Sequence, residues 1–378
     1  MSRPAPAVTV LGVNYPPEPT GISPYTGAMA RGLSRRGYRT HVVTTHPHYP
    51  EWRVSAGYGQ WSRREHLDGV DALRVRHYVP SKPSGIRRLL SELSFGLRLL
   101  FAPLGGRDAA VLVSPALFSS ALAAFRLRLF RKKTPVVVWV QDLYWLGLRE
   151  TGQDGGLSSK VIKATEKWLL STADRVVVIH DRFAARVADD YGIPPESIHV
   201  VRNWTHLAPT APVDRSVART ARGWGDEVVV LHAGNMGIKQ GLGNVIDAAR
   251  LAEAQGAPIR FVLMGGGGER DRLKALAEGV STVQFLDPLP DAEFSAALAA
   301  ADILLVNEYP GVSEMAVPSK LTSYFSSGRP VIAATDKNGI TADEIRAAGA
   351  GVVVPAASPQ SLLDASLELG RDHERAEQ

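Results

Sequence analysis

The stretch from Ala301 to Ala334 constrains the fold of this chain more than any other. Its apolar run Ile303–Val306 predicts a buried strand, and a loop rich in Gly, Pro and Ser follows. Pro318-Ser319-Lys320 then leads into a helical pattern that ends at Gly328, before another strand. Parallel α/β sheets bind ligands beside the carboxyl ends of their strands, so this loop and Lys320 are predicted to meet an anion. The alternative is a loop and helix without a ligand.

Length and composition narrow the classes further. A chain of 378 residues with 45% hydrophobic content suggests two domains, which we place at residues 1–206 and 207–378. The absence of cysteine excludes disulfides and thiolate chemistry. None of the ten histidines forms an H-x-x-x-H pair around an acid, so we expect no metal. We also expect no signal peptide and no membrane span, because the longest uncharged run, Ala109–Phe125, is short and contains Pro115.

The charge differs strongly between the two halves. Residues 1–206 carry 28 Lys and Arg against 16 Asp and Glu, a balance of +12, whereas residues 207–378 carry −7. A basic first half predicts contact with an anionic surface, and its basic residues alternate with leucines rather than with stacking aromatics. We therefore expect the first half to bind an anionic membrane leaflet and not a nucleic acid. The residues concerned are Arg87, Arg88, Arg98, Arg126, Arg128, Arg131, Lys132 and Lys133.

The first half follows an α/β order. The strand Val8–Val13 runs into a proline-rich loop in which Gly21 would let the backbone approach a phosphate or sugar, although on its own a simple turn explains this glycine better. No G-x-G-x-x-G motif is present. The strand Pro135–Val140 is followed by a predicted loop, Gln141–Trp145, which would face an acceptor. Further strands are expected at Arg39–Thr44, Val70–Val79, Ala109–Val113, Arg175–Ile179 and Ile198–Val201, with helices at Tyr25–Arg36, Ile86–Leu100, Ala116–Phe130, Lys160–Ser171 and Asp181–Tyr191.

A second α/β cycle begins after a linker without apolar periodicity at His206–Gly225. The strand Val228–Leu231 enters a turn that contains Gly234, Asn235 and Lys239 ahead of a helix. Flexible amides and one compact cation suit a diphosphate, although the sequence is not a Walker A motif. The next strand, Arg260–Met264, ends in four glycines that would admit a flat ring or a phosphate. Later strands are expected at Thr282–Leu286, Val331–Ala334 and Gly351–Val354, with helices at Leu242–Ala254, Glu269–Ala277, Glu293–Ala300 and Pro359–Leu369.

The order of these motifs resembles the family 4 retaining glycosyltransferases, and within them the colanic-acid and capsule branch. The motifs are PPEPTGIS, VQDLYW, GNMGIKQG, MGGGGERDRL, FLDPLP and VPSKLTSYFSSGRPV, and they span nearly the whole chain. The resemblance implies an α/β GT-B fold, with two Rossmann-like domains facing across a cleft. The first domain would bind the acceptor and the second a nucleotide-sugar donor, without a required metal or other cofactor.

The resemblance also implies roles for individual residues. Lys239 would bind the donor diphosphate, with Gly234 in the same turn and Asn235 where many relatives have an arginine. Glu314 would approach the donor sugar, and Gly21 the donor phosphate or sugar. Ser319 and Lys320 would flank the diphosphate, and the donor base would be bordered by Gly265, Gly266, Gly267, Phe285, Leu286 and Asp287.

Three features depart from the family pattern. Many relatives have two glutamates eight positions apart, and these positions fall here on Met315 and Ser323. Gln141 stands where many relatives have a histidine. The carboxyl end is also expected to be short, because relatives usually add a further helix. A retaining transferase needs no dedicated base if the departing diphosphate accepts the acceptor proton, as proposed for this family.

Two other functions remain open. A sugar-nucleotide epimerase or phosphorylase would need acid–base residues, for which Asp142 and Glu314 are the candidates. A non-catalytic nucleotide-sugar-binding subunit would fit the missing glutamate pair. We favour transfer to a saccharide or lipid-linked acceptor in cell-envelope polysaccharide or glycolipid biosynthesis. The expected place is the cytoplasm, peripheral on the inner face of the plasma membrane.

Overall fold

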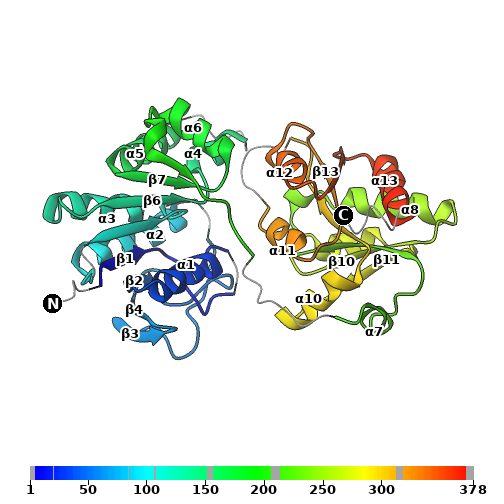
Figure 1. The fold of residues 1–378 in the computed structure, drawn as a ribbon, viewed down its shortest axis with the longest axis horizontal. Helices are drawn as coiled ribbons and strands as arrows, with labels where there is room; N and C mark the ends of the chain where they lie inside the picture. Colours follow the sequence, from blue (N-terminus) through cyan, green and yellow to red (C-terminus); the bar gives the residue numbers. More distant parts are fainter. Residues whose placement is uncertain are drawn as a thin grey trace. The chain divides into compact units, whose positions relative to one another are not determined.

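The computed structural model describes residues 5–19, 21–83, 85–105, 108–150, 156–205, 213–311 and 318–371. The chain divides into two compact units, Met1–His206 and Leu207–Gln378. Each unit has its own twisted sheet, covered by helices on both faces (Figure 1). The α/β class expected from the alternation of apolar strands and amphipathic helices is therefore confirmed.

The sheet of the first unit has eight strands among the described residues, in the order β3-β4-β2-β1-β5-β6-β7-β8. All neighbours are parallel except β3, which forms an antiparallel edge with β4. The strands are β1 (Ala7–Leu11), β2 (Arg39–Thr45), β3 (Ser62–Leu67), β4 (Val70–Val75), β5 (Ala109–Val113), β6 (Val136–Val140), β7 (Arg175–Val178) and β8 (Ile198–Val200).

The helices of the first unit include a closely packed pair, α2 and α3. A Cβ atom at Gly96 would lie 3.0 Å from the Cα atom of Ser119, so glycine permits this approach. The guanidinium of Arg126 on α3 donates to the carbonyls of Leu99 and Ala102 at the end of α2. The helices are α1 (Ser23–Arg35), α2 (Gly85–Phe101), α3 (Leu117–Phe130), α4 (Tyr144–Glu150), α5 (Leu157–Thr172), α6 (Asp181–Tyr191) and the 3-10 turn η1 (Pro195–Ser197).

The sheet of the second unit has six parallel strands among the described residues, in the order β11-β10-β9-β12-β13-β14. The third strand in chain order lies at one edge and the sixth at the other, which is the doubly wound order of dinucleotide-binding sheets. The strands are β9 (Val228–Ala233), β10 (Ile259–Met264), β11 (Val283–Leu286), β12 (Ile303–Asn307), β13 (Val331–Thr335) and β14 (Gly351–Pro355).

Two apolar cores lie against this sheet. One joins it to α8 and α13, which pack against each other, and the other joins it to α10, α11 and α12. The chain therefore leaves β9 for one face and β12 for the other. The helices are α7 (Arg215–Thr220), the 3-10 turn η2 (Ile238–Gln240), α8 (Gly243–Ala254), α9 (Arg270–Leu276), α10 (Asp291–Ala300), α11 (Lys320–Ser326), α12 (Ile340–Ala348) and α13 (Pro359–Arg371).

Two expectations for the first unit were wrong. The strand predicted at Val70–Val79 ends at Val75, and an unpredicted strand, β3, precedes it. This strand is polar and lies at the sheet edge, so it lacks the apolar run that marks buried strands. A signal was present in Asp68-Gly69, whose positive φ angles of 50° and 78° form the tight hairpin turn. The loop predicted at Gln141–Trp145 also turns into the short helix α4 at Tyr144.

Two helices of the second unit were missed. The helix α7 lies inside the predicted linker, and Asp214 caps it by accepting from the amides of Ser216 and Val217. The helix α12 begins after Gly339 and ends at Gly349, whose φ of 58° is a typical helix stop. Both are short, and their apolar residues are too few to produce a clear period.

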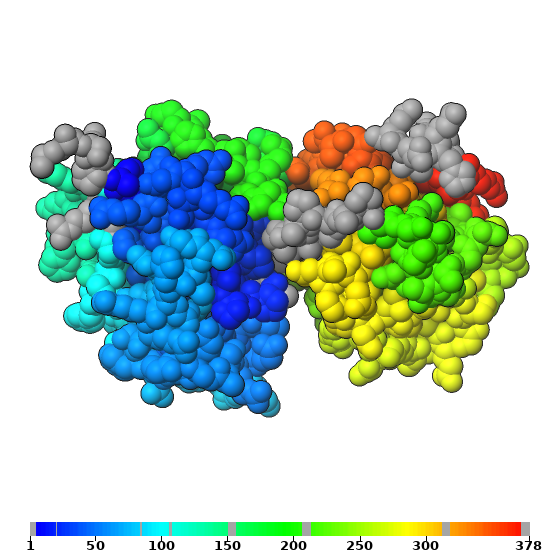
Figure 2. Space-filling model, turned by 60° about the horizontal axis from the view of Figure 1, so that its bottom comes forward, coloured from blue at the N-terminus to red at the C-terminus, as the bar shows by residue number. Residues whose placement is uncertain are grey.

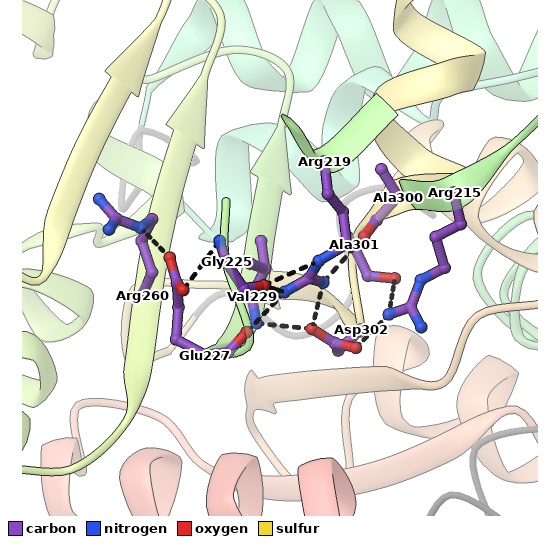
Figure 3. Close-up of polar contacts among 9 residues, drawn as sticks. All are labelled: Arg215, Arg219, Gly225, Glu227, Val229, Arg260, Ala300, Ala301 and Asp302. Atoms are coloured by element: carbon purple, nitrogen blue, oxygen red, sulfur yellow. Dashed lines mark hydrogen bonds and ion pairs between the residues drawn. The ribbon is translucent and has the colours of Figure 1, made fainter. Parts of the chain in front are cut away.

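Asp302 lies directly before β12 and connects α7 to the sheet through a hydrogen bond and ion pairs (Figure 3). Its carboxylate accepts from the amide of Val229 at 2.8 Å and from Arg219 at 2.8 Å, and it also pairs with Arg215. Arg219 also donates to the carbonyl of Glu227 at 2.7 Å. Burial alone would raise the pKa of Asp302, but the amide and both guanidinium groups outweigh it and hold the pKa below its usual value.

We predict that Asp302→Asn lowers the free energy of unfolding of the second unit by about 2 kcal/mol at pH 7. The folded-state pKa is depressed, so the stabilisation is present above the unfolded-state pKa of about 4 and is lost as the pH falls through the folded value. Urea unfolding at several pH values measures this difference. Asp247→Asn, which removes the exposed pair with Arg250, is the control and should change little. An equal loss of unfolding free energy in both variants would contradict the stabilising role of the Asp302 carboxylate.

Candidate functional site

The candidate site of the second unit lies where β9 and β12 are neighbours. The chain departs from these two strands toward opposite faces of the sheet, and such a switch point leaves a crevice beyond their carboxyl ends. The glycine turn with Lys239 follows β9, and the segment that leads to Lys320 follows β12. The structure thus places Gly234, Lys239 and Lys320, each predicted from sequence, in segments that follow the two strands of the switch point.

The glycine turn after β9 rests on the glycine turn after β10. The amide of Met236 donates to the carbonyl of Gly266 at 2.7 Å. A Cβ atom at Gly265 would lie 2.0 Å from the carbonyl oxygen of Gly234, and one at Gly267 would lie 2.5 Å from that of Met236. These glycines are therefore required for contact between the two turns, a reason that the sequence did not indicate. Both also have positive φ angles, 136° and 143°, which disfavour any other residue.

Lys320 is the first residue of α11, and its side chain reaches back over the end of β9. Its ammonium nitrogen lies 3.4 Å from Nδ1 and 3.3 Å from Nε2 of the fully buried His232. A Cβ atom at Gly234 would lie 3.7 Å from the same nitrogen. Burial lowers the pKa of Lys320 to about 7, and the nearby charge of Glu308 only partly opposes this. Burial and Lys320 together hold the pKa of His232 well below its usual value, so the imidazole is neutral.

Glu308 follows β12 and completes this group. Its carboxylate accepts from the hydroxyls of Thr335 and Thr341, the latter at 2.8 Å. Burial raises its pKa, against the effect of the two threonines and of Lys320. Sequence reasoning missed both Glu308 and His232 as members of the site. The signal for Glu308 was an acid placed directly after a buried apolar strand, in VNEYP.

Further contacts near Lys320, His232 and Glu308 hold the segments that follow β9 and β12 in position. The hydroxyl of Tyr324 accepts from the amide of Ala233 at 2.8 Å. Asn307, the last residue of β12, donates to the carbonyls of Gln240 and Gly241 at 2.8 and 3.0 Å. The amide of Tyr309 donates to the carbonyl of Lys239 at 2.7 Å, which ties the lysine turn to the loop after β12. The backbone of the turn is thus held by the side chain of Asn307 and the amide of Tyr309, while Lys239 is exposed.

The other residues predicted to bind the donor differ in their surroundings. Asn235 and Ser319 are exposed, beside Lys239 and Lys320. Phe285 and Leu286 pack into the cores on opposite faces of the sheet. Asp287 is exposed and pairs with Arg270 at 2.5 Å. Glu314 and Met315 lie outside the described residues, whereas Ser323 is buried on α11.

The predicted residues of the first unit follow β1 and β6. Gly21 has a φ of 67°, and a Cβ atom there would touch the ring of Tyr49 at 3.4 Å. Its loop is held by the buried Glu18, whose carboxylate accepts from the amides of His48 and Tyr49 at 2.8 and 2.9 Å. Asp142 lies beyond β6, and its carbonyl accepts from the hydroxyl of Ser114 at 3.3 Å.

The side chain of Gln141, which departs from the family pattern, is paired with another amide. It donates to Asn203 at 3.1 Å and accepts from Asn203 at 2.9 Å. A paired amide of this kind holds two loops together and offers no titrating group. Within the described part of the chain, no group of three or more acidic or histidine side chains could hold a metal ion.

Comparison with solved structures gives the class of fold. Sucrose-phosphate synthase from Thermosynechococcus elongatus superimposes with a TM-score of 0.70 at 17% identity, over 98% of this chain and 91% of that one. Anabaena HepE, solved in complex with UDP, has a TM-score of 0.66 at 17% identity, over 98% and 92% of the two chains. The protein has the GT-B fold, as the motif order suggested.

Comparison with protein families gives the family. Residues 20–204 match the glycosyl transferase 4-like domain, and residues 227–372 match the glycosyl transferases group 1. The Escherichia coli (strain K12) protein named as the colanic acid biosynthesis glycosyl transferase WcaI is 32% identical over 337 residues, which are 85% of this chain and 81% of that relative. The chain belongs to the family 4 glycosyltransferases, and it is a glycosyltransferase of the EC 2.4 class.

Proposed function

We propose that this glycosyltransferase is a retaining enzyme of cell-envelope polysaccharide or glycolipid biosynthesis. It moves a hexosyl or N-acetylhexosaminyl group from a nucleotide-sugar donor to a saccharide or lipid-linked acceptor. The observation that carries the proposal is the group formed by Lys320, His232 and Glu308 at the switch point of the second sheet, beside the turn of Lys239. The relationship to a colanic acid biosynthesis protein supports a polysaccharide pathway.

The proposed mechanism is stabilisation of the departing nucleoside diphosphate. Lys239 and Lys320 supply two positive charges, and the amides of the glycine turn supply hydrogen bonds to the phosphate oxygens. Asn235 can add a neutral hydrogen bond where many relatives have an arginine. Attack from the face of departure lets the diphosphate accept the acceptor proton, so a dedicated base is not required. The two lysines take the role that a divalent cation has in metal-dependent transferases, and we propose that no metal is needed.

The second unit is the proposed donor-binding domain. The backbone of Gly265, Gly266 and Gly267 borders the base, together with the residues at the end of β11, while Ser319 flanks the diphosphate. The first unit is the proposed acceptor-binding domain, in which Gly21 and Asp142 lie in loops beyond strand ends. Glu314 is the proposed contact with the donor sugar.

Thermal unfolding with UDP, GDP, dTDP and ADP tests the donor assignment. UDP leads the panel because it is the nucleotide in the HepE complex. Ligands that bind only the folded state raise its stability, by about 2.7 kcal/mol at one hundred times the dissociation constant. Slow release of the same diphosphate from its nucleotide sugar would support a transferase over a binding subunit. Stabilisation by none of the four would contradict the proposal.

The proposed acceptor is lipid-linked, and α2 and α3 provide the surface to reach it. The apolar side chains of Ile86, Leu90, Leu97 and Phe101 form one exposed stripe on α2, and Phe125, Leu129 and Phe130 are exposed on α3. Exposed apolar side chains on two helices of a basic unit suit an anionic leaflet. None of the described helices is long and apolar enough to cross a bilayer. The proposed location is the cytoplasmic face of the plasma membrane.

Three of the eight basic residues singled out from sequence already make contacts within the first unit. Arg126 caps the end of α2. Arg128 pairs with Asp174 at 2.7 Å. Arg98 lies 3.8 Å above the ring of Trp61. The exposed Lys132 and Lys133, beside α3, are therefore the better residues for a test.

We predict that neutralising Lys132 and Lys133 with glutamine weakens binding to anionic vesicles about 30-fold at low salt. Each basic residue near an anionic surface contributes about 1 kcal/mol, and screening reduces this as salt rises. Vesicle sedimentation measures the binding. The control is the double replacement of Lys160 and Lys167, which are exposed on α5 of the same unit. Equal and negligible binding to neutral and anionic vesicles would favour a soluble acceptor.

A further inference from the structure

The first unit contains a pocket of about 670 Å³ that the proposed donor chemistry does not use. It lies beyond the ends of β2 and β4, between the loop that precedes β3 and the helix α2. The loop after β2 and the β3–β4 hairpin, in lighter blue, gather on one side of this unit (Figure 2). The volume is within the range of pockets for small organic ligands.

A buried histidine at this pocket has an unused hydrogen-bonding atom. His46 is 1% exposed, and its Nε2 atom lies 2.8 Å from the carbonyl oxygen of Gln60. Its Nδ1 atom is buried without a hydrogen-bond partner among the described residues. Burial lowers the pKa of His46, so the ring is neutral, donates from Nε2 and keeps a lone pair on Nδ1. A buried acceptor without a partner, on a residue that lines a pocket, is a candidate contact for the hydroxyl group of a ligand.

A second histidine in the lining repeats this feature. The Nε2 atom of His77 is also buried without a partner in the described part of the chain. Desolvation, with His48 and His46 nearby, holds the pKa of His77 well below its usual value. Both imidazoles are therefore neutral hydrogen-bonding groups. Two such groups in one pocket match a ligand with several hydroxyls better than a simple ion.

The rest of the lining adds an aromatic surface and positive charge. Trp61 is 68% exposed, and its carbonyl accepts from Arg98 at 2.9 Å and from the amide of Arg76 at 3.2 Å. Arg76 and Arg98 both line the pocket, and no carboxylate occurs among its described lining residues. The Nε atom of Arg98 is buried and has no hydrogen-bond partner in the part of the chain that the structure describes. Aromatic faces accept the C–H face of a pyranose, and guanidinium groups pair with carboxylates.

We propose that this pocket binds an acidic sugar residue, with a carboxylate, as part of the acceptor. The sugar ring packs on Trp61, its hydroxyls hydrogen-bond to Nδ1 of His46 and Nε2 of His77, and its carboxylate pairs with Arg76 and Arg98. That the sugar belongs to the acceptor rests on the proposed function. The binding of the acidic sugar itself does not.

Ligand-observed NMR titration of the full chain tests the site with methyl β-D-glucuronide as probe and methyl β-D-glucoside as its neutral match. We expect the glucuronide to bind at least ten times more tightly than the glucoside. Trp61→Ala and Arg76→Gln should each weaken the glucuronide at least fivefold, because both change exposed side chains and leave the backbone contacts of Trp61 intact. Trp168→Ala is the matched control, since Trp168 is 42% exposed on α5, outside the pocket.

Equal affinity for the two sugars would overturn the proposal, as would undiminished glucuronide binding in both pocket variants. Thermal stabilisation by the nucleoside diphosphates is measured on the same samples. Glucuronide binding without nucleotide stabilisation would support the pocket and contradict the donor assignment. Nucleotide stabilisation without glucuronide binding would overturn this inference and leave the proposed function standing.

Discussion

Lys239→Ala is expected to lower kcat/KM for sugar transfer about 100- to 1000-fold while the second unit stays folded. Lys239 lies in the turn η2 and is exposed, whereas the carbonyl of the same residue accepts from Tyr309. The substitution removes a charge and keeps the backbone contact that shapes the turn. A charge-assisted hydrogen bond contributes about 1.5–3 kcal/mol to binding, and groups that stabilise developing charge contribute about 3–4 kcal/mol to the barrier.

Initial rates with the donor found by thermal unfolding measure this effect. Lys239→Arg keeps the charge and should recover part of the activity. Lys274→Ala removes an exposed lysine on α9 of the same unit and should leave the rate near that of the wild type. Urea unfolding of each variant separates lost chemistry from lost structure. A folded Lys239→Ala variant with unchanged kcat/KM would remove Lys239 from the site.

The sequence predicted the fold well where strands are apolar and glycine ends helices. Runs such as Ile303–Val306 are buried on both faces, so their composition alone marks them. The missed elements depend on contacts between distant residues. The helix α7 is held by Arg219, whose partner Asp302 lies 83 residues further along the chain. No local pattern in a six-residue helix could have revealed that partner.

The donor site shows the same limit. Lys239 and Lys320 could be predicted because each stands in a recognisable turn near a helix start. His232 and Glu308 were missed, because their importance comes from parallel strands that bring them beside Lys320, and the acid after β12 was the one local signal for Glu308. The glycines after β10 were predicted for a ligand, yet they also have to accommodate the turn after β9. Sequence identifies residue types suited to a diphosphate, whereas the charge state of Lys320 follows only from tertiary burial.

The second prediction with a large effect follows from the charge state of Lys320. We expect nucleotide binding to be coupled to protonation of this lysine. With a pKa of about 7, Lys320 is mostly neutral at pH 8 in the free enzyme. A diphosphate beside it favours the charged form, so binding should be accompanied by uptake of a proton. From this pKa we expect roughly 0.9 proton per nucleotide at pH 8, falling toward zero below pH 6. His232 stays neutral near this pH because burial and Lys320 hold its pKa low.

Titration calorimetry of the bound nucleoside diphosphate in buffers of different ionisation enthalpy measures this uptake. Lys320→Met should abolish it and weaken nucleotide binding at least tenfold, because the phosphate charge then lacks one of two cations. The same lowered pKa predicts that the free wild-type protein gains stability between about pH 7 and pH 10, where only the unfolded state binds the proton of Lys320. Lys320→Met should lose this gain. Proton uptake that is equal in wild type and Lys320→Met would exclude Lys320 as the group that responds to the donor.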